Sequence, residues 1–276
     1  MERNWHPLQV VSTDSLRPLS RVTESSVHRL TSEISTDGRQ RNPIAVARLD
    51  SGERIILDGV SRWRAFNQLG IGDILAQTVE LDDPNLELSS WRHLVSHLTA
   101  VELERMLQRL CLSFEKFDSD FFCQEVHSPA DGILVVLSDR SAYRVLIDRA
   151  DLSKFNRQLS DFVMGYSTNS QVVRLHAEHH TAEVIADSGT EQACIHLPTY
   201  TCDEVLEITA SGDLLPPYLA CYSFPHRYLD VGLSLKILSA KTSIDDKNAF
   251  LDDLIRMRLS RSRAAFYPQS VFLMGD

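Results

Sequence analysis

Apolar residues in the first part of the chain fall into short runs typical of strands and into spaced sets typical of helices. Val27, Leu30 and Ile34 recur at helical intervals, with candidate N-cap oxygens at 23–25 and Gly38 just past the end. The other elements expected here are strands at 8–11, 43–49, 54–57 and 74–81, a bend at 16–19, and a helix that begins near 61 and is closed by Gly70. Together they predict a compact first domain over residues 1–85.

The remainder of the chain shows a more mixed pattern. Between Leu88 and Leu110 the apolar residues follow a long amphipathic pattern of helical type. The other elements expected are a hairpin of 133–137 and 142–147, helices at 152–163, 203–209 and 248–259, and strands at 172–186, 218–224 and 270–274. We therefore expect a second domain of mixed α/β structure over residues 86–276, and an α+β fold for the chain.

Composition limits the classes of protein that fit. The chain has 276 residues, of which 43% are hydrophobic and 24% charged, as in ordinary globular proteins. It holds no apolar run near the ~20 residues that span a bilayer, and its N-terminus lacks a signal-peptide core, so we expect a cytoplasmic protein without a membrane partner. Five widely spaced cysteines without a CxxC pair favour buried or incidental thiols over a zinc ribbon or a disulfide framework.

The balance of charged residues limits the ligands that the chain is expected to bind. A net charge of −10 argues against nonspecific binding of polyanions, so nucleic acid is not expected as a partner. Residues 1–85 hold ten arginines and no lysine. A phosphate bound in this domain would therefore be held by arginine and backbone amides.

The segment from Arg54 to Ala65 carries the clearest chemical pattern. It reads as a buried strand, a turn at Asp58-Gly59 and a helix that starts with Ser61 and Arg62. A glycine permits close approach of a ligand, the amides of a helix start favour an anion, and an arginine grips phosphate in a bidentate manner. An ordinary strand–turn–helix corner, with Asp58 as a helix cap and Arg62 in a surface ion pair, is the alternative.

The order of these elements, with Asn42-Pro43-Ile44 before the hairpin and Asp58-Gly59-X-X-Arg62 after it, resembles the ParB/sulfiredoxin fold over residues 8–81. Farther on, 211–217 (Ser-Gly-Asp-Leu-Leu-Pro-Pro) followed by a strand and Arg227 resembles the free L-serine kinases, the staphyloferrin B siderophore-biosynthesis members among them. The resemblance implies a transferase that phosphorylates L-serine to O-phospho-L-serine with ATP or ADP and Mg²⁺, and that supplies siderophore or diaminopropionate-type biosynthesis.

Three positions depart from the pattern of those kinases. Ser20 stands where they carry a catalytic glutamate, Ser61 where their phosphate loop has histidine, and Ala220-Cys221 where they have Thr-Arg. Loss of a general base typically costs ~10²–10⁴ in rate. Glu24, one helical turn beyond Ser20, could supply a carboxylate, and a solvated glutamate in a first helical turn is the alternative.

The candidate site residues follow from the loop and from the resemblance. The catalytic candidates are Asp58, Ser20 and Glu24, and Asp58 is also the candidate Mg²⁺ ligand. The phosphate and nucleotide candidates are Gly59, Val60, Ser61, Arg62, Asn42, Pro43 and Ile44. The acceptor candidates are Cys221, Tyr222, His226 and Arg227. His176, Glu178 and His180 would share one strand face, either as a metal site or as a solvated face, with His179 pointing away.

Three functions are compatible with these residues. The first is a kinase-like phosphotransferase from ATP or ADP to the hydroxyl of L-serine or a related amino acid, with nucleotide and amino acid as its partners. The second is a catalytically degenerate, nucleotide- or small-molecule-binding regulator of the same fold. DNA binding, as in partition proteins, is disfavoured by the acidic balance. A homodimer is left open.

Overall fold

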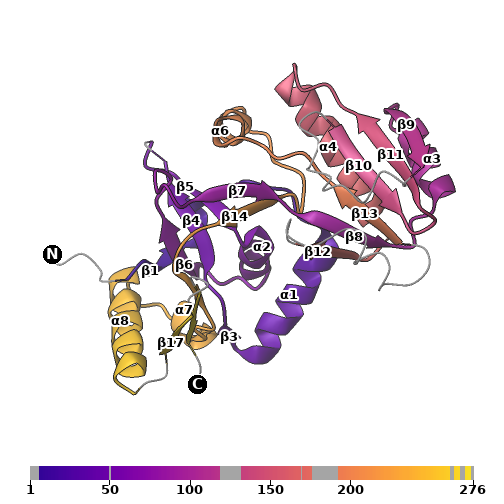
Figure 1. Cartoon of the computed structure of the whole chain (residues 1–276). Helices are drawn as coiled ribbons and strands as arrows, with labels where there is room; N and C mark the ends of the chain where they lie inside the picture. The colour runs from indigo at the N-terminus through magenta and orange to yellow at the C-terminus, as the bar shows by residue number, and fades with distance from the viewer. Residues whose placement is uncertain are drawn as a thin grey trace. The chain divides into compact units, whose positions relative to one another are not determined.

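A computed structural model describes residues 6–49, 51–118, 132–168, 170–175, 192–261, 264–267 and 271–274. The chain divides into two compact units (Figure 1). Unit 1 joins residues 1–87 to 222–276, and unit 2 comprises residues 88–221. The expected first boundary, after 85, lies close to the observed one, but residues 222–276 return to unit 1 instead of continuing the second domain.

Unit 1 is built on a mixed five-stranded sheet in the order β1-β6-β4-β5-β2. Its strands are β1 (Leu8–Ser12), β2 (Leu16–Pro18), β4 (Ile44–Arg48), β5 (Arg54–Asp58) and β6 (Asp73–Val79). β6 pairs parallel with β4 and antiparallel with β1, and β5 pairs antiparallel with β4 and parallel with β2. Four of these strands were expected, and the expected bend at 16–19 is instead the short strand β2.

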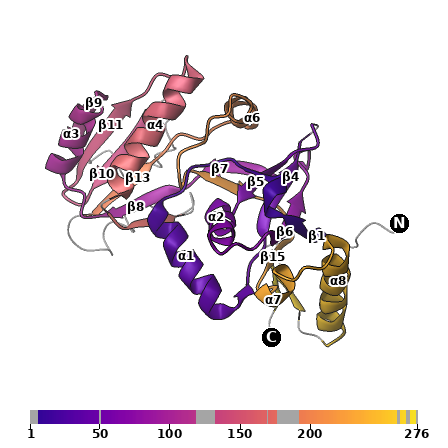
Figure 2. The ribbon, with the colours of Figure 1, turned by 180° about the vertical axis from the view of Figure 1, so that it is seen from behind.

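Helices from both ends of the chain cover this sheet. They are η1 (Thr13–Ser15), α1 (Glu24–Asp37), α2 (Val60–Gln68), α7 (Leu235–Leu238) and α8 (Ile244–Ser260). One buried cluster includes Ile44, Phe66, Leu251 and Ile255, each at most 1% exposed. Figures 1 and 2 both show α8 beside β1. Residues of the C-terminal helix α8 therefore belong to the same buried core as residues of the N-terminal strands and helices.

Short strands complete unit 1. β3 (Arg39–Gln40) pairs with β16 (Leu233–Ser234), and β15 (Arg227–Leu229) pairs with β18 (Val271–Met274), which also pairs with β17 (Ala264–Tyr267). These pairings bring residues 227–234 to the loop between α1 and β4, because β16 lies on β3. The sequence predicted β18, as the strand at 270–274, but not β3, β15, β16 or β17.

Two side-chain amides extend the hydrogen bonding of the sheet. The Gln40 amide accepts from Leu75 N and donates to Leu75 O, both at 2.8 Å. On the other side of the Val10–Leu75 pair, Asn248 of α8 accepts from Val10 N at 2.7 Å and donates to Val10 O at 3.2 Å. Asn248 thus covers the edge strand β1, and an unpaired edge would be open to association.

Unit 2 is built on an antiparallel six-stranded sheet in the order β12-β8-β13-β10-β11-β9. The strands are β8 (Arg92–Ser96), β9 (Ser113–Asp118), β10 (Gly132–Leu137), β11 (Ser141–Leu146), β12 (Val172–Leu175) and β13 (Gln192–His196), and the helices are α3 (Ala100–Arg109), α4 (Leu152–Ser167) and α6 (Cys202–Ala210). The chain passes between the units in β7 (Glu87–Ser90) and β14 (Ala220–Ser223), which pair with each other.

The mixture of helices and sheets confirms the expected α+β class, and one element was predicted wrongly. Residues 88–110 do not form one long amphipathic segment but contain β7, β8 and then α3. In β8, His93 and Val95 are buried while their neighbours are partly exposed, which is the period of a strand. α3 begins only at Thr99, whose capping box with Glu102 fixes its N-terminus. The expected strand at 172–186 is seen as β12, and its remainder lies outside the described residues.

Two further findings concern the cysteines and the membrane-spanning capacity of the helices. Of the cysteines in the described residues, Cys194 and Cys221 are buried and Cys111 and Cys202 are exposed, and none of these four forms a disulfide. Among the described helices, none is both long and apolar enough to cross a membrane.

Replacement of Gln40 should destabilise unit 1. Gln40→Leu removes the partners of Leu75 N and Leu75 O, and each buried unpaired backbone group costs ~1–3 kcal/mol, so we expect a loss of about 2–6 kcal/mol of unfolding free energy. Urea unfolding measures it. Gln108→Leu, at an exposed position of α3, is the matched control and should stay within about 0.5 kcal/mol of the parent. Equal stability of the two variants would contradict the role of Gln40 as the hydrogen-bond partner of the Leu75 backbone.

Acid should destabilise the protein through histidines of unit 2. Burial lowers the pKa of both His93 and His196 from 6.5 to about 4. His93 Nε2 donates to Tyr218 O at 2.8 Å, and Nδ1 lies at Tyr166 Oη, which suits a neutral ring. Between pH 6.5 and about 4 the unfolded chain therefore binds more protons than the folded chain, so stability falls as the pH drops through that window and is retained above it.

Each histidine contributes up to roughly 3 kcal/mol to this fall. Urea unfolding from pH 4 to pH 8 measures it. His93→Phe should reduce the pH slope, whatever its absolute stability, because one of the histidines with a lowered pKa is then removed. The same slope in the parent and in His93→Phe would exclude His93 as a source.

Candidate functional site

The corner between β5 and α2 requires glycine for two reasons. Asp58 ends β5, Gly59 has φ 101° and α2 begins at Val60. A Cβ at position 59 would lie 2.5 Å from Ile44 Cγ2, so a side chain is excluded by contact as well as by the left-handed backbone. The buried Ile44 of β4 thus holds the backbone of the corner close to the sheet.

The first turn of α2 presents its amides at this corner. The first bond within the helix runs from Trp63 N to Gly59 O at 3.0 Å, so the amides of residues 60–62 precede it. With the helix dipole they place about half a positive charge at the corner. This is the expected geometry for an anion site at a helix N-terminus.

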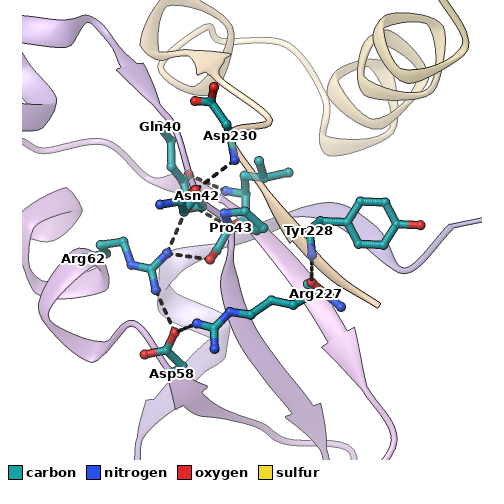
Figure 3. A network of polar contacts seen from close by, with 10 residues as sticks. Gln40, Asn42, Pro43, Asp58, Arg62, Arg227, Tyr228 and Asp230 are labelled. Atoms are coloured by element: carbon teal, nitrogen blue, oxygen red, sulfur yellow. Dashed lines mark hydrogen bonds and ion pairs between the residues drawn. The ribbon is translucent and has the colours of Figure 1, made fainter. Parts of the chain in front are cut away.

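The Arg62 side chain ties the helix to the loop before β4. Nη1 donates to Asn42 O at 2.9 Å and to Pro43 O at 2.6 Å, and Nη2 donates to Asp58 Oδ2 at 3.0 Å (Figure 3). The side chain is 18% exposed. Arg62 is therefore hydrogen-bonded to three residues of the corner and its neighbouring loop.

A second arginine reaches the same carboxylate from the C-terminal part of unit 1. Arg227, the first residue of β15, donates from Nη2 to Asp58 Oδ2 (Figure 3). Its guanidinium also lies over the ring of Phe224, with Cζ 5.4 Å from the ring centroid, in cation–π geometry. One carboxylate thus faces two guanidinium groups.

The main chain around Arg227 is fixed by side chains of the sheet and the loop. Gln77 of β6 donates to His226 O and accepts from Tyr228 N, both at 3.0 Å, and Asn42 Oδ1 accepts from Asp230 N at 2.9 Å. His226 and Asp230 have φ values of 58° and 49°, a left-handed conformation that costs non-glycine residues energy. Burial raises the pKa of Tyr228 and keeps that phenol neutral.

The structure brings together most of the predicted loop residues. Asn42, Pro43, Asp58 and Arg62 are joined by the contacts above, and Arg227 of the acceptor set joins them. Ile44 and Val60 pack into the core, where they shape the corner, and Ser61 lies half-buried in the first turn of α2. His226 contributes its carbonyl, to Gln77, while the residue is exposed.

Other predicted residues lie in different surroundings. Glu24 begins α1 with a 65% exposed side chain 3.5 Å from Arg64 Nη2, which matches the alternative of a solvated first-turn glutamate. Ser20 follows β2 and is half-buried. Cys221 and Tyr222 lie in β14 with buried side chains. The catalytic and acceptor roles of these residues stay predictions.

The donor set at Asp58 does not fit a metal ion. Its carboxylate is shared by two guanidinium groups, which would face any cation bound there. No cluster of three or more histidine, cysteine or acidic side chains suited to a metal occurs in the part of the chain that the structure describes. Mg²⁺ at Asp58 stays a prediction that these contacts do not support. His176, Glu178, His179 and His180 lie outside the described residues.

Sequence reasoning missed the residues that position the site. Gln40 and Gln77 are 1% and 4% exposed, and both bond backbone groups of neighbouring segments. Gln77 interrupts the apolar run of 74–79, and such a polar residue in a buried strand signals a buried hydrogen bond. Phe224 and Asp230 gave no comparable signal, because their roles depend on the path of the chain after residue 221.

The fold defined by this sheet and corner is free serine kinase-like, as predicted. The solved structure of SbnI from Staphylococcus aureus, with a C-terminal truncation, matches with a TM-score of 0.69 at 18% identity, over 92% of this chain and 97% of that one. A conserved hypothetical protein from Pyrococcus furiosus matches at 0.67 and 14%, over 84% and 97%.

A variant of a free serine kinase in complex with ADP matches with a TM-score of 0.65 at 12% identity, over 84% of this chain and 94% of that one. At these identities the likeness shows the fold. No protein-family model matches the chain, and no curated protein does so.

A methyl group at position 59 should damage the corner more than one at another left-handed glycine. Gly59→Ala adds a clash with Ile44 to the ~1–2 kcal/mol cost of the left-handed backbone, so we expect a loss of about 2–4 kcal/mol of unfolding free energy. Gly70→Ala is the matched control, since Gly70 has φ 68° and an added Cβ meets nothing within 4 Å. Urea unfolding compares them. Equal losses would show that Ile44 does not constrain the corner.

Proposed function

We propose that the chain is a kinase-like phosphotransferase, which transfers the terminal phosphoryl group of ATP or ADP to the hydroxyl of a small free amino acid, L-serine or a related acceptor. The observation that carries this proposal is the corner at Gly59, where the amides that open α2 lie beside an arginine-rich cluster. A variant of a free serine kinase with a similar fold was solved in complex with ADP, which supports a nucleotide as the ligand.

The charges of the corner suit phosphate. The helix start adds about half a positive charge, and two guanidinium groups face one carboxylate. Transfer of a phosphoryl group depends mainly on position and on neutralising the phosphate oxygens, and both are supplied by amides and arginines. Mg²⁺ would enter as a companion of the nucleotide and would supply further charge neutralisation.

The proposed reaction makes one bond and breaks one. The acceptor hydroxyl oxygen bonds to the terminal phosphorus, and the bond from that phosphorus to the bridging oxygen breaks, with its electron pair leaving on the shorter nucleotide. The hydroxyl proton passes to a nearby base or to water. Asp58 is proposed to orient the hydroxyl, and Cys221, Tyr222, His226 and Arg227 form the proposed acceptor side. A supply of phosphoserine to siderophore or diaminopropionate-type biosynthesis is part of the same proposal.

A regulator that binds a nucleotide without turnover is the second candidate. Two observations favour it: Ser20 stands at the position of the kinases' glutamate, and Asp58 is held by two arginines. A serine hydroxyl stays protonated at neutral pH and cannot serve as the general base.

Calorimetry with ATP and ADP, combined with coupled nucleotide turnover across free hydroxy amino acids, tests both candidates. We expect nucleotide binding together with slow phosphorylation of L-serine or a related acceptor, and Ser20→Glu should raise the rate by ten- to about 10⁴-fold by restoring a carboxylate. Ser25→Glu, which adds the same charge in the first turn of α1, should not raise it. Binding without turnover in the parent and in Ser20→Glu would leave the regulator, and absence of binding would exclude both.

A further inference from the structure

We infer that Arg227 is the arginine that binds an oxyanion of the ligand, by exchanging its ion pair with Asp58 for the ligand, and that Arg62 is a fixed part of the corner. The inference rests on the proposed function, because it assigns the anion-binding side chain of that same site. It reverses the assignment that the Asp-Gly-X-X-Arg spacing favours.

The contacts of Arg62 oppose a direct role in ligand binding. Its guanidinium donates to Asn42 O, Pro43 O and Asp58 Oδ2. A turn toward a ligand would take the Arg62 donor from both backbone carbonyls. Asn42 O is exposed and keeps Gln40 Nε2 as a donor, whereas the partly buried Pro43 O would lose the Arg62 donor. Loss of a donor away from water is costly, so Pro43 O and the ion pair with Asp58 hold this side chain in place.

The contacts of Arg227 suit exchange. Its side chain is 35% exposed, against 18% for Arg62. Among the described residues its polar partner is Asp58, and its other contact is the ring of Phe224. A flat aromatic surface permits sliding of a guanidinium without loss of the cation–π attraction.

Asp58 can release Arg227 at low cost. After the exchange its Oδ2 still accepts from Arg62, so the carboxylate is not left unpaired in a half-buried place. The main chain of Arg227 is held on both sides, since Gln77 bonds His226 O and Tyr228 N. The movement is therefore confined to the side chain.

The ligand chemistry that fits is an oxyanion with two adjacent oxygens, because the fork of a guanidinium binds phosphate or carboxylate in a bidentate manner. A nucleotide phosphate and the carboxylate of an amino acid share this chemistry. ADP and L-serine separate the two sources, because ADP carries no carboxylate and L-serine carries no phosphate.

The test measures affinity and stability together in the full chain. Dissociation constants for ADP and for L-serine are measured by calorimetry, and urea midpoints are measured in parallel, for the parent and for Arg227→Gln, Arg62→Gln, Asp58→Asn and Arg64→Gln. Arg64 is the matched control, because it lies on the same helix as Arg62 and pairs at the surface with Glu24.

Arg227→Gln should weaken one probe by roughly ten- to a hundredfold while the urea midpoint stays near that of the parent. Loss for ADP identifies phosphate as the partner, and loss for L-serine identifies carboxylate. Asp58→Asn should tighten the same probe by about three- to tenfold, because no carboxylate then competes for Arg227. Arg62→Gln should lower the urea midpoint, and Arg64→Gln should change neither quantity.

The outcomes separate this inference from the proposed function. If the parent binds ADP, and Arg227→Gln binds ADP and L-serine as tightly as the parent does, the exchange is excluded while nucleotide binding stands. If the parent binds L-serine through Arg227 but binds neither ADP nor, in the calorimetry described above, ATP, the exchange stands and the phosphotransferase is excluded. If the parent binds none of ADP, ATP and L-serine, both are excluded.

Discussion

The carboxylate of Asp58 is the point through which three segments of unit 1 are joined. It ends strand β5, accepts from the helix that follows, and accepts from a strand that comes 169 residues later. Arg62 extends the connection to the loop before β4. The contacts of Asp58 are therefore complete only when the sheet, α2 and the C-terminal segment are in register, and the buried amides of Gln40 and Gln77 bond the backbone on which that register depends.

The charge of this cluster differs in sign from that of the chain. Two guanidinium groups and the start of a helix outweigh one carboxylate, within a protein of net charge −10. Such a field attracts a compact anion that fits between side chains, while the surrounding negative charge opposes a long polyanion.

Local patterns were sufficient for the elements of the first half of unit 1. The helical spacing of Val27, Leu30 and Ile34 and the turn at Asp58-Gly59 are properties of neighbouring residues, and the structure has α1 and the β5–α2 corner there. The role of Arg62 in the corner and the approach of Arg227 depend on residues distant in sequence. A single sequence does not contain that information, because no local pattern distinguishes an arginine that faces a carbonyl from one that faces a ligand.

Unit 1 is discontinuous, and this has a consequence for biosynthesis. Residues 88–221 form a compact unit of their own that leaves the ribosome before residues 222–276. Until those residues emerge, Val10 lacks its amide partner from Asn248 and Asp58 lacks Arg227. A chain interrupted inside unit 2 would thus display an open sheet edge, which is prone to association, and a corner without its second cation.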